Sequence, residues 1–390
     1  TIRAGAEMTC QEVRFIPVRF KDAYGPVGAW FLLFKSAATN AYGGNYMMER
    51  RPELENWKPY GMVKPVPANL RNYLMLLDVN EGKAPIYMQT AEAIQRIADG
   101  TPDPKERKKK LKELEAEAWE DFLDMTISQA MLWAANDIFP EEHPSEIAAA
   151  EPYFIGSHSG ASGAWVSGPE DIAPKDYFWG YEGMTTVKGL FAAGDASGAS
   201  SHKFSSGSHA EGRIAAKAAI RYIVNEKPEL VDIDGVDALK EKILRPLKLY
   251  EDNKDKTTQD DVNPEYILAK MYMMRLQKLM DEYAGGVSAA FTTNDMCLKR
   301  ACELIDLLKE DAEKLGARDS HELMRCWENV HRTYQADSHV RAMLVREETR
   351  WPGYYFRSDT PKMDNENWNV FVNGTYDAAK NEWSWKKVPV

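Results

Sequence analysis

The spacing of hydrophobic and polar residues predicts a mixed architecture in the first part of the chain. Residues 1–20 end in a roughly alternating segment, which favours a β-strand. Residues 37–104 contain many glycines and prolines and are expected to be rich in loops. Residues 105–135 carry leucine and tryptophan at heptad-like spacing, which predicts a helix whose lysine run faces solvent.

The second part of the chain combines glycine-rich segments with helices. Residues 151–168 are rich in glycine and serine, a composition that lets the backbone approach a ligand closely. Residues 189–198 predict a buried strand that ends in a glycine turn, and an alanine-rich helix begins near His209. Residues 228–350 are expected to be mostly helical. The tail returns to β-prone residues, with Asn373-Gly374 as a turn signal.

Composition narrows the classes of function. A net charge of −11 over 390 residues argues against a general affinity for nucleic acid. The four cysteines include no CxxC pair, so we expect no iron–sulfur cluster and no other metal site in this chain. No run of about 18 apolar residues occurs, which argues against a membrane-spanning helix.

The most informative chemical pattern lies between residues 189 and 219. A predicted strand leads into a turn that contains Gly194 and Asp195. A glycine-bearing loop, Ser205-Ser206-Gly207-Ser208, then precedes the alanine-rich helix. Backbone N–H groups at a helix N-terminus suit an anion or a carbonyl oxygen of a flavin ring. The Asp195 carboxylate suits ribityl or ribose hydroxyls. The same pattern is also typical of tight strand–helix packing.

This segment resembles the C-terminal flavin motif of the fumarate reductase and succinate dehydrogenase flavoprotein superfamily. The opening Ala4–Met8 stretch and Ser338–Arg341 near the C-terminus resemble other parts of the superfamily pattern. Two departures argue against a dicarboxylate substrate. The superfamily's His-Pro-Thr is replaced by Ile16-Pro17-Val18, and its arginine-bearing loop is replaced by residues 203–208.

A closer resemblance, over essentially the whole chain, is to the alpha subunits of adenylylsulfate reductases. It rests on four strings, VRFKDAYGPVGAWFLLFK, ANLRNYL, PYFIGSHSGASG and GDASGASSHKFSSGSHAEGRIA. The resemblance implies an FAD-bearing subunit that reduces adenosine 5'-phosphosulfate to sulfite and AMP, or catalyses the reverse, through a flavin N5–sulfite adduct. It also implies a cytoplasmic protein with an iron–sulfur beta subunit as partner.

The resemblance further implies the residues of the site. Arg19 and His158 would act on the sulfate end of the substrate. The nucleotide would lie against Val27, Gly28, Phe31, Leu32, Arg71 and Phe204. FAD would lie against Gly194, Asp195, Ser205, Ser206, Gly207 and Ser208. Taken singly, Arg19 also suits a surface ion pair, His158 an ordinary loop histidine, and Phe204 plain packing.

The implied fold is α/β plus α, with part of a glutathione-reductase-like FAD domain, an inserted α+β capping domain and a C-terminal helical domain. The expected bounds are 1–15 and 151–247 for the two FAD-domain segments, 16–150 for the cap and 248–390 for the helical domain. Because the chain opens inside a strand-forming segment without Met, we expect a fragment that lacks the N-terminal FAD-binding part. Two alternatives stay open: another flavoprotein of the superfamily, such as a fumarate reductase or aspartate oxidase, and a non-catalytic interaction fragment.

Overall fold

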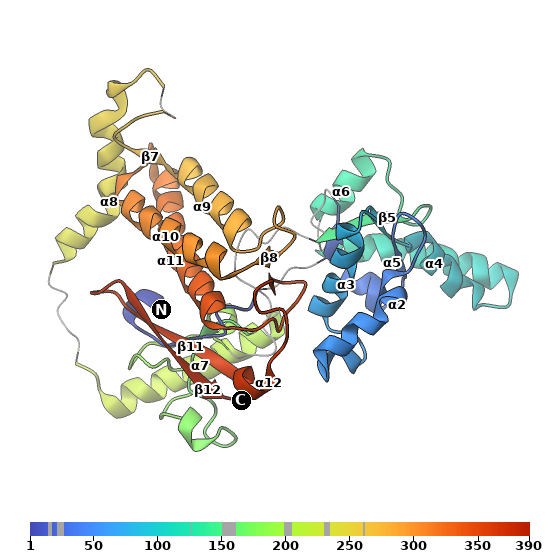
Figure 1. Ribbon diagram of the computed structural model, residues 1–390, viewed down its shortest axis with the longest axis horizontal. Coiled ribbons are helices and arrows are strands. Elements are labelled where there is room, and N and C mark those ends of the chain that lie inside the picture. The colour runs from blue at the N-terminus through green and yellow to red at the C-terminus, as the bar shows by residue number, and fades with distance from the viewer. Residues whose placement is uncertain are drawn as a thin grey trace. The chain divides into compact units, whose positions relative to one another are not determined.

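The computed structural model describes residues 1–14, 18–21, 27–125, 127–149, 161–198, 205–229, 235–259 and 262–390. Backbone contacts divide the chain into two compact units. Unit 1 comprises Thr1–Phe15, Pro152–Thr349 and Tyr355–Val390, and unit 2 comprises Ile16–Glu151 and Arg350–Tyr354. Figure 1 shows the elements of both units. Within the described ranges, no helix is long and apolar enough to cross a membrane.

Unit 2 is built on a four-stranded antiparallel sheet with the order β2-β5-β4-β3. The strands are β2 (Val18–Phe20), β3 (Ala38–Thr39), β4 (Ile86–Met88) and β5 (Ser145–Ala149). The α-helices are α1 (Gly28–Leu32), α2 (Tyr46–Glu49), α3 (Ala68–Asn80), α4 (Thr90–Asp99), α5 (Pro104–Met125) and α6 (Ile127–Ala135). Two 3-10 helices, η2 (Arg51–Trp57) and η3 (Tyr60–Met62), precede α3.

The sequence expectations for unit 2 are partly confirmed. β2 forms where alternation predicts a strand, and α5 and α6 cover most of residues 105–135. The expectation that residues 37–104 are rich in loops is wrong, because α3 and α4 occupy much of that range. α3 buries Leu70 and Leu74, one helical turn apart. Its preceding proline, Pro67, is the N-cap residue, so the proline marks where the helix begins and does not break it.

Unit 1 contains a second antiparallel sheet, with the order β12-β11-β1-β6. Its strands are β1 (Met8–Thr9), β6 (Gly163–Ala164), β11 (Val370–Asp377) and β12 (Glu382–Pro389). Two short parallel pairs join β7 (Ile267–Leu268) to β9 (Leu315–Gly316) and β8 (Thr292–Thr293) to β10 (Phe356–Arg357). The 3-10 helices are η1 (Ile2–Ala4), η4 (Lys175–Tyr177), η5 (Gly194–Ala196), η6 (Lys254–Lys256) and η7 (Ala312–Lys314).

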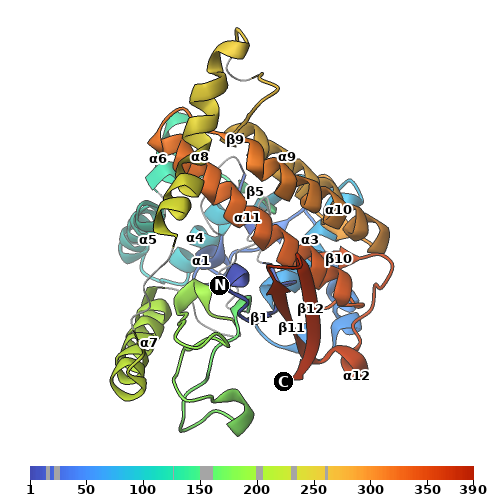
Figure 2. The same cartoon turned by 90° about the vertical axis from the view of Figure 1, so that its left-hand side faces the viewer.

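Helices make up most of the rest of unit 1, as predicted for residues 228–350. They are α7 (Ser205–Glu226), α8 (Val236–Asn253), α9 (Ala269–Tyr283), α10 (Asp295–Asp311), α11 (Ser320–Val345) and α12 (Asn365–Trp368). α9, α10 and α11 pack side by side (Figures 1 and 2). The Asn294 and Asp319 side chains cap α10 and α11 by accepting a backbone N–H of the first turn.

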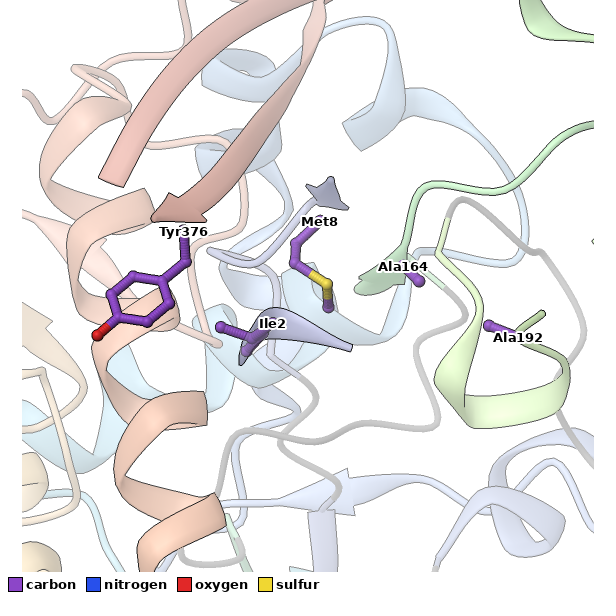
Figure 3. Close-up of a cluster of buried hydrophobic side chains, with 5 residues drawn as sticks. All are labelled: Ile2, Met8, Ala164, Ala192 and Tyr376. Carbon is purple, nitrogen blue, oxygen red and sulfur yellow. The ribbon is translucent and has the colours of Figure 1, made fainter. Parts of the chain in front are cut away.

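A hydrophobic cluster joins the start of the chain to segments far away in sequence. Figure 3 shows its five buried side chains, Ile2, Met8, Ala164, Ala192 and Tyr376. They come from η1, β1, β6, the segment before η5, and β11. Beside this cluster, Ser197 forms a bridge with Ala164 of β6, and the Gly198 N–H donates to the Ala164 carbonyl oxygen at 2.7 Å, so the end of the glycine turn lies against the sheet.

The C-terminal hairpin forms as predicted, but its turn does not lie at Asn373-Gly374. Gly374 lies within β11, opposite Trp385 of β12. A Cβ at Gly374 would lie 2.4 Å from the Trp385 ring, so this glycine makes room for an indole. The chain reverses after Asp377, and Asn381 adopts the left-handed conformation there, with φ of 56°.

His339 of α11 makes the stability of unit 1 sensitive to acid. The imidazole is fully buried, its Nδ1 lies 2.7 Å from the Gln11 carbonyl oxygen, and its Nε2 has no partner. Burial and the nearby Arg14 guanidinium lower the pKa of His339 to about 3, whereas an unfolded chain gives about 6.5. The unfolded state therefore binds the extra proton first, and stability should fall as the pH drops from about 6.5 towards 3.

We expect His339→Gln to make the melting temperature less dependent on pH between about pH 6.5 and 4, measured by thermal unfolding. His321→Gln, which changes an exposed residue of the same helix, is the matched control and should keep the original pH dependence. Equal pH dependence in the two variants would contradict this role of His339.

Candidate functional site

In unit 1, the turn that contains Gly194 is hydrogen-bonded to the first turns of α7. Gly194 has a φ of 61°, a conformation that favours glycine. Its N–H donates to Glu211 Oε2 at 2.8 Å, and Ser197 Oγ donates to the same oxygen at 2.8 Å. A Cβ at Gly194 would lie 3.1 Å from Ser208 Oγ. The single carboxylate of Glu211 thus holds both ends of the turn.

Two expectations for this segment are wrong. Residues 189–198 do not form an extended strand: Phe191 makes only an isolated bridge to Met184, and Gly194–Ala196 is the 3-10 helix η5. Ser205-Ser206-Gly207-Ser208 is not a loop before the helix but the first turn of α7. The first four N–H groups of a helix have no acceptor within the helix, so they are the donors that suit an anion or a carbonyl oxygen.

A cavity of about 860 Å³ lies beside the glycine turn, wholly within unit 1. Asp195 is exposed and lines it together with Gln11, Ser162 and Gly163. A Cβ at Gly163 would lie 2.4 Å from the Ser197 carbonyl carbon, so only glycine permits this close approach of two backbones. The volume falls within the roughly 300–1,000 Å³ of typical cofactor pockets.

Unit 2 carries the other predicted residues that the structure describes. Arg19 lies in β2 and is partly buried, between the buried Val18 and Phe20. The Val27 N–H donates to the Val18 carbonyl oxygen at 3.4 Å, which places the start of α1 beside β2. Val27 is buried, and Gly28 follows it as the first residue of α1.

The structure brings Arg71 of α3 to Phe31 of α1, 40 positions earlier. The Arg71 guanidinium carbon lies 5.1 Å from the centre of the Phe31 ring, a cation–π contact. Among the described residues, no carboxylate pairs with the Arg71 guanidinium. Burial lowers the pKa of Arg71, while Tyr46 and Tyr354 act to raise it. A half-buried cation without a counter-ion suits a planar or anionic ligand.

Sequence reasoning missed the two tyrosines beside Arg71. Tyr46 is fully buried and its hydroxyl has no hydrogen-bond partner, and Tyr354 is also buried. Burial raises the phenol pKa of both residues, so both stay neutral. In the sequence, Tyr46 has only the pattern of an aromatic anchor, and Tyr354 lies 283 positions from Arg71, so no spacing signal links them.

Two predicted residues, His158 and Phe204, lie outside the described residues, as do the side chains of Leu32 and Ser205. Arg19 belongs to unit 2 and the segment that carries His158 belongs to unit 1. Their joint action on one substrate therefore stays a prediction.

Comparison with known proteins gives consistent matches. Residues 273–390 match the family model for the C-terminal part of the fumarate reductase flavoprotein. The adenylylsulfate reductase subunit alpha of Megalodesulfovibrio gigas is 48% identical over 399 residues, covering 99% of this chain and 59% of the relative. Adenylylsulfate reductase from Archaeoglobus fulgidus is 56% identical with a TM-score of 0.95, over 100% of this chain and 60% of that chain.

Further solved structures extend the comparison. An adenosine-5-phosphosulfate reductase in complex with sulfite, as a covalent adduct, also shows a TM-score of 0.95, 56% identity and coverage of 100% of this chain and 60% of that one. An E. coli quinol fumarate reductase is 15% identical with a TM-score of 0.66, over 99% of this chain and 60% of that chain, and shares the fold alone. The chain thus spans about 60% of the length of the relatives that it matches. It has a mixed α/β fold and is, over its whole length, a homologue of part of the adenylylsulfate reductase alpha subunits.

Proposed function

We propose that this chain is part of the catalytic subunit of an adenylylsulfate reductase. The subunit would reduce adenosine 5'-phosphosulfate by two electrons to sulfite and AMP, or catalyse the reverse reaction. The observation that carries the proposal is the 56% identity and TM-score of 0.95 to such a reductase over the entire chain. The Arg71 guanidinium adds support, because it stacks on Phe31, pairs with no carboxylate of the described residues and offers a planar face that suits a purine.

FAD is the cofactor that the family implies, and the residues of unit 1 fit it. When bound, FAD supplies the two-electron chemistry of the reaction. The 860 Å³ cavity has the size of a cofactor pocket, and Gly163, which lines it, packs its backbone directly against that of Ser197 beside the glycine turn. We infer that Asp195 accepts hydrogen bonds from ribityl or ribose hydroxyls. The N–H groups of Ser205, Ser206, Gly207 and Ser208 would donate to flavin carbonyl oxygens.

The domain assignment follows from the same proposal. Residues 1–15 and 151–247 would belong to a glutathione-reductase-like FAD domain, residues 16–150 to the capping domain and residues 248–390 to a helical domain. The cap would then contribute Arg19 and the nucleotide-binding residues, while the FAD domain would contribute His158 and Phe204. In this arrangement Arg19 offers its guanidinium to the sulfate oxygens and to the charge that develops as AMP leaves, with His158 as a further donor.

We propose that the electrons pass through an iron–sulfur beta subunit in the cytoplasm. Burial raises the pKa of the Cys302 thiol to about 11 and of the Cys326 thiol to about 12. Among the described residues, no group of three or more His, Cys, Asp or Glu side chains forms a metal site.

The test is an assay of the intact protein, co-expressed with a beta subunit, for AMP-dependent oxidation of sulfite. We expect turnover with AMP and sulfite and none with fumarate or succinate. Turnover with a dicarboxylate alone would instead support another member of the superfamily. A protein that binds its partner but turns over none of these substrates would support the non-catalytic alternative.

Arg71→Gln is expected to weaken AMP binding about tenfold, because a desolvated cation–π contact contributes roughly 1–2 kcal/mol. The measurement is the Kd for AMP by calorimetry. Arg51→Gln is the matched control, since Arg51 is an exposed arginine of unit 2 outside this contact, and its Kd should not change. An unchanged Kd in Arg71→Gln would remove Arg71 from the nucleotide site.

A further inference from the structure

A second, smaller cavity lies in the helical part of unit 1, and we propose that it binds an inorganic oxyanion of the sulfate, sulfite or phosphate type. Its volume is about 80 Å³. α8 and α11 supply most of its lining, and α9, α10, η7, β9 and η1, through Arg3, supply the rest. None of the residues assigned above to the nucleotide or the flavin lines it, although Arg3 and Tyr334 also line the larger cavity beside Gly194.

Positive charge is concentrated around this cavity although the chain as a whole carries −11. Four cationic side chains line it, and among the lining residues the one carboxylate is Glu313. Two of the cations are compensated: Arg245 pairs with Glu313 through Nη1, and Lys309 lies 2.8 Å from the buried Asp337 carboxylate. The other two, Arg3 and Lys242, form no ion pair with any residue that the structure describes.

Hydrogen-bond donors also remain unused at this site. The Nε of Arg245 is buried and has no acceptor among the residues that the structure describes. Leaving a buried donor unsatisfied is unfavourable, and more so for a charged group. Arg3 is held in place by stacking, because its guanidinium carbon lies 5.2 Å from the centre of the Tyr334 ring. An oxyanion between Arg3, Lys242 and Arg245 would pair with both uncompensated cations and lie against the Arg245 guanidinium.

The size of the cavity selects the class of ligand. One bound water needs about 10–15 Å³ on this measure, so 80 Å³ holds roughly five to eight such volumes. That space suits one small oxyanion with a few waters. It excludes a nucleotide, because ligands of that size occupy pockets of roughly 300 Å³ or more. The tetrahedral or pyramidal oxygens of sulfate, phosphate and sulfite match the forked donors of two arginines.

The proposal is tested on the intact protein by calorimetry with sodium phosphate, sulfate and sulfite in separate titrations, each at constant ionic strength. We expect saturable binding of at least one anion, with a Kd raised about tenfold or more in Arg245→Met. Lys242→Met should raise it about threefold to tenfold, and Lys242 is exposed, so its loss does not threaten folding. The control is Lys240→Met, an exposed lysine of the same helix outside the cavity, which should bind as the original protein does.

Location is tested by soaking crystals with selenate, whose anomalous peak should lie between Arg3, Lys242 and Arg245. Equal affinities in the Lys242→Met and Lys240→Met proteins, or a peak elsewhere, would overturn the proposal. Binding of sulfite alone, unaffected by Lys242→Met, would also overturn it, since that result would place the anion at the catalytic site.

Discussion

Replacing Arg19 with alanine is expected to lower kcat/KM for adenosine 5'-phosphosulfate about 100-fold, mainly through kcat. The expected loss follows from removing one charged contact to a developing negative charge, which typically contributes about 2.7–4 kcal/mol. The fold should survive, because Val18 and Phe20 anchor β2 on the opposite face and Phe20 packs edge-on to Trp133, with ring centres 4.9 Å apart. The measurement is steady-state turnover of the intact protein with its partner subunit.

Two further variants separate a catalytic role from a structural one. Arg19→Lys keeps the charge but loses the planar fork, so we expect it to recover only part of the rate. Lys21→Ala removes the neighbouring cation, whose Nζ pairs with Glu146 at 3.1 Å on an exposed surface. Such pairs contribute about 0–1 kcal/mol, so this control should turn over at nearly the original rate. If Arg19→Ala and Lys21→Ala have the same kcat/KM, Arg19 takes no part in the chemistry.

Arg346→Met is expected to destabilise unit 1 by about 3–5 kcal/mol, because it leaves buried carboxylates without their counter-ion. Arg346 is 1% exposed, and its Nε and Nη1 donate at 2.7 Å to Glu12 and Glu348, which are both fully buried. Its remaining donors reach the backbone oxygens of Trp368 and Val370. One guanidinium therefore joins the start of the chain to the end of α11 and the beginning of β11.

Thermal unfolding measures the effect as a fall in melting temperature on the order of 10 °C. Arg325→Met is the matched control, because it removes an ion pair to Glu328 on the surface of the same helix and should shift the melting temperature by no more than a few degrees. Adding Glu12→Gln to Arg346→Met should restore part of the stability, since it removes one of the buried carboxylate charges that lack a counter-ion. A melting temperature of Arg346→Met equal to that of the control would show that the buried network contributes little.

The outcome at the glycine segments shows where reasoning from local sequence fails. Asn373-Gly374 has the sequence of a hairpin turn, yet Gly374 lies inside β11 because only a glycine leaves space for the Trp385 ring. The segment before Gly194 has the composition of a buried strand, yet Phe191 forms only one bridge there. In both cases, a distant side chain or strand decides what the local residues become, and no local pattern records that contact.

Several features were determined by the sequence alone. The periodicity of residues 105–135 and 228–350 was enough to predict that both ranges are helical, although it did not separate α5 from α6 or give the bounds of α8 to α11. The family resemblance could also be recognised from four long sequence strings, because the order of residues along the chain does not depend on the fold. These strings supplied the predicted site residues, including Arg19, Arg71 and Asp195, and that assignment stays a prediction.

Only the tertiary structure decided which of those residues share an environment. It placed the Arg71 guanidinium on Phe31 beside the buried Tyr46 and Tyr354, and it gathered Arg3, Lys242 and Arg245 around one small cavity. The physical reason is that burial and electrostatic fields depend on distance in space, whereas a sequence pattern records distance along the chain. Charges from segments hundreds of residues apart acquire a common function only when packing brings them together.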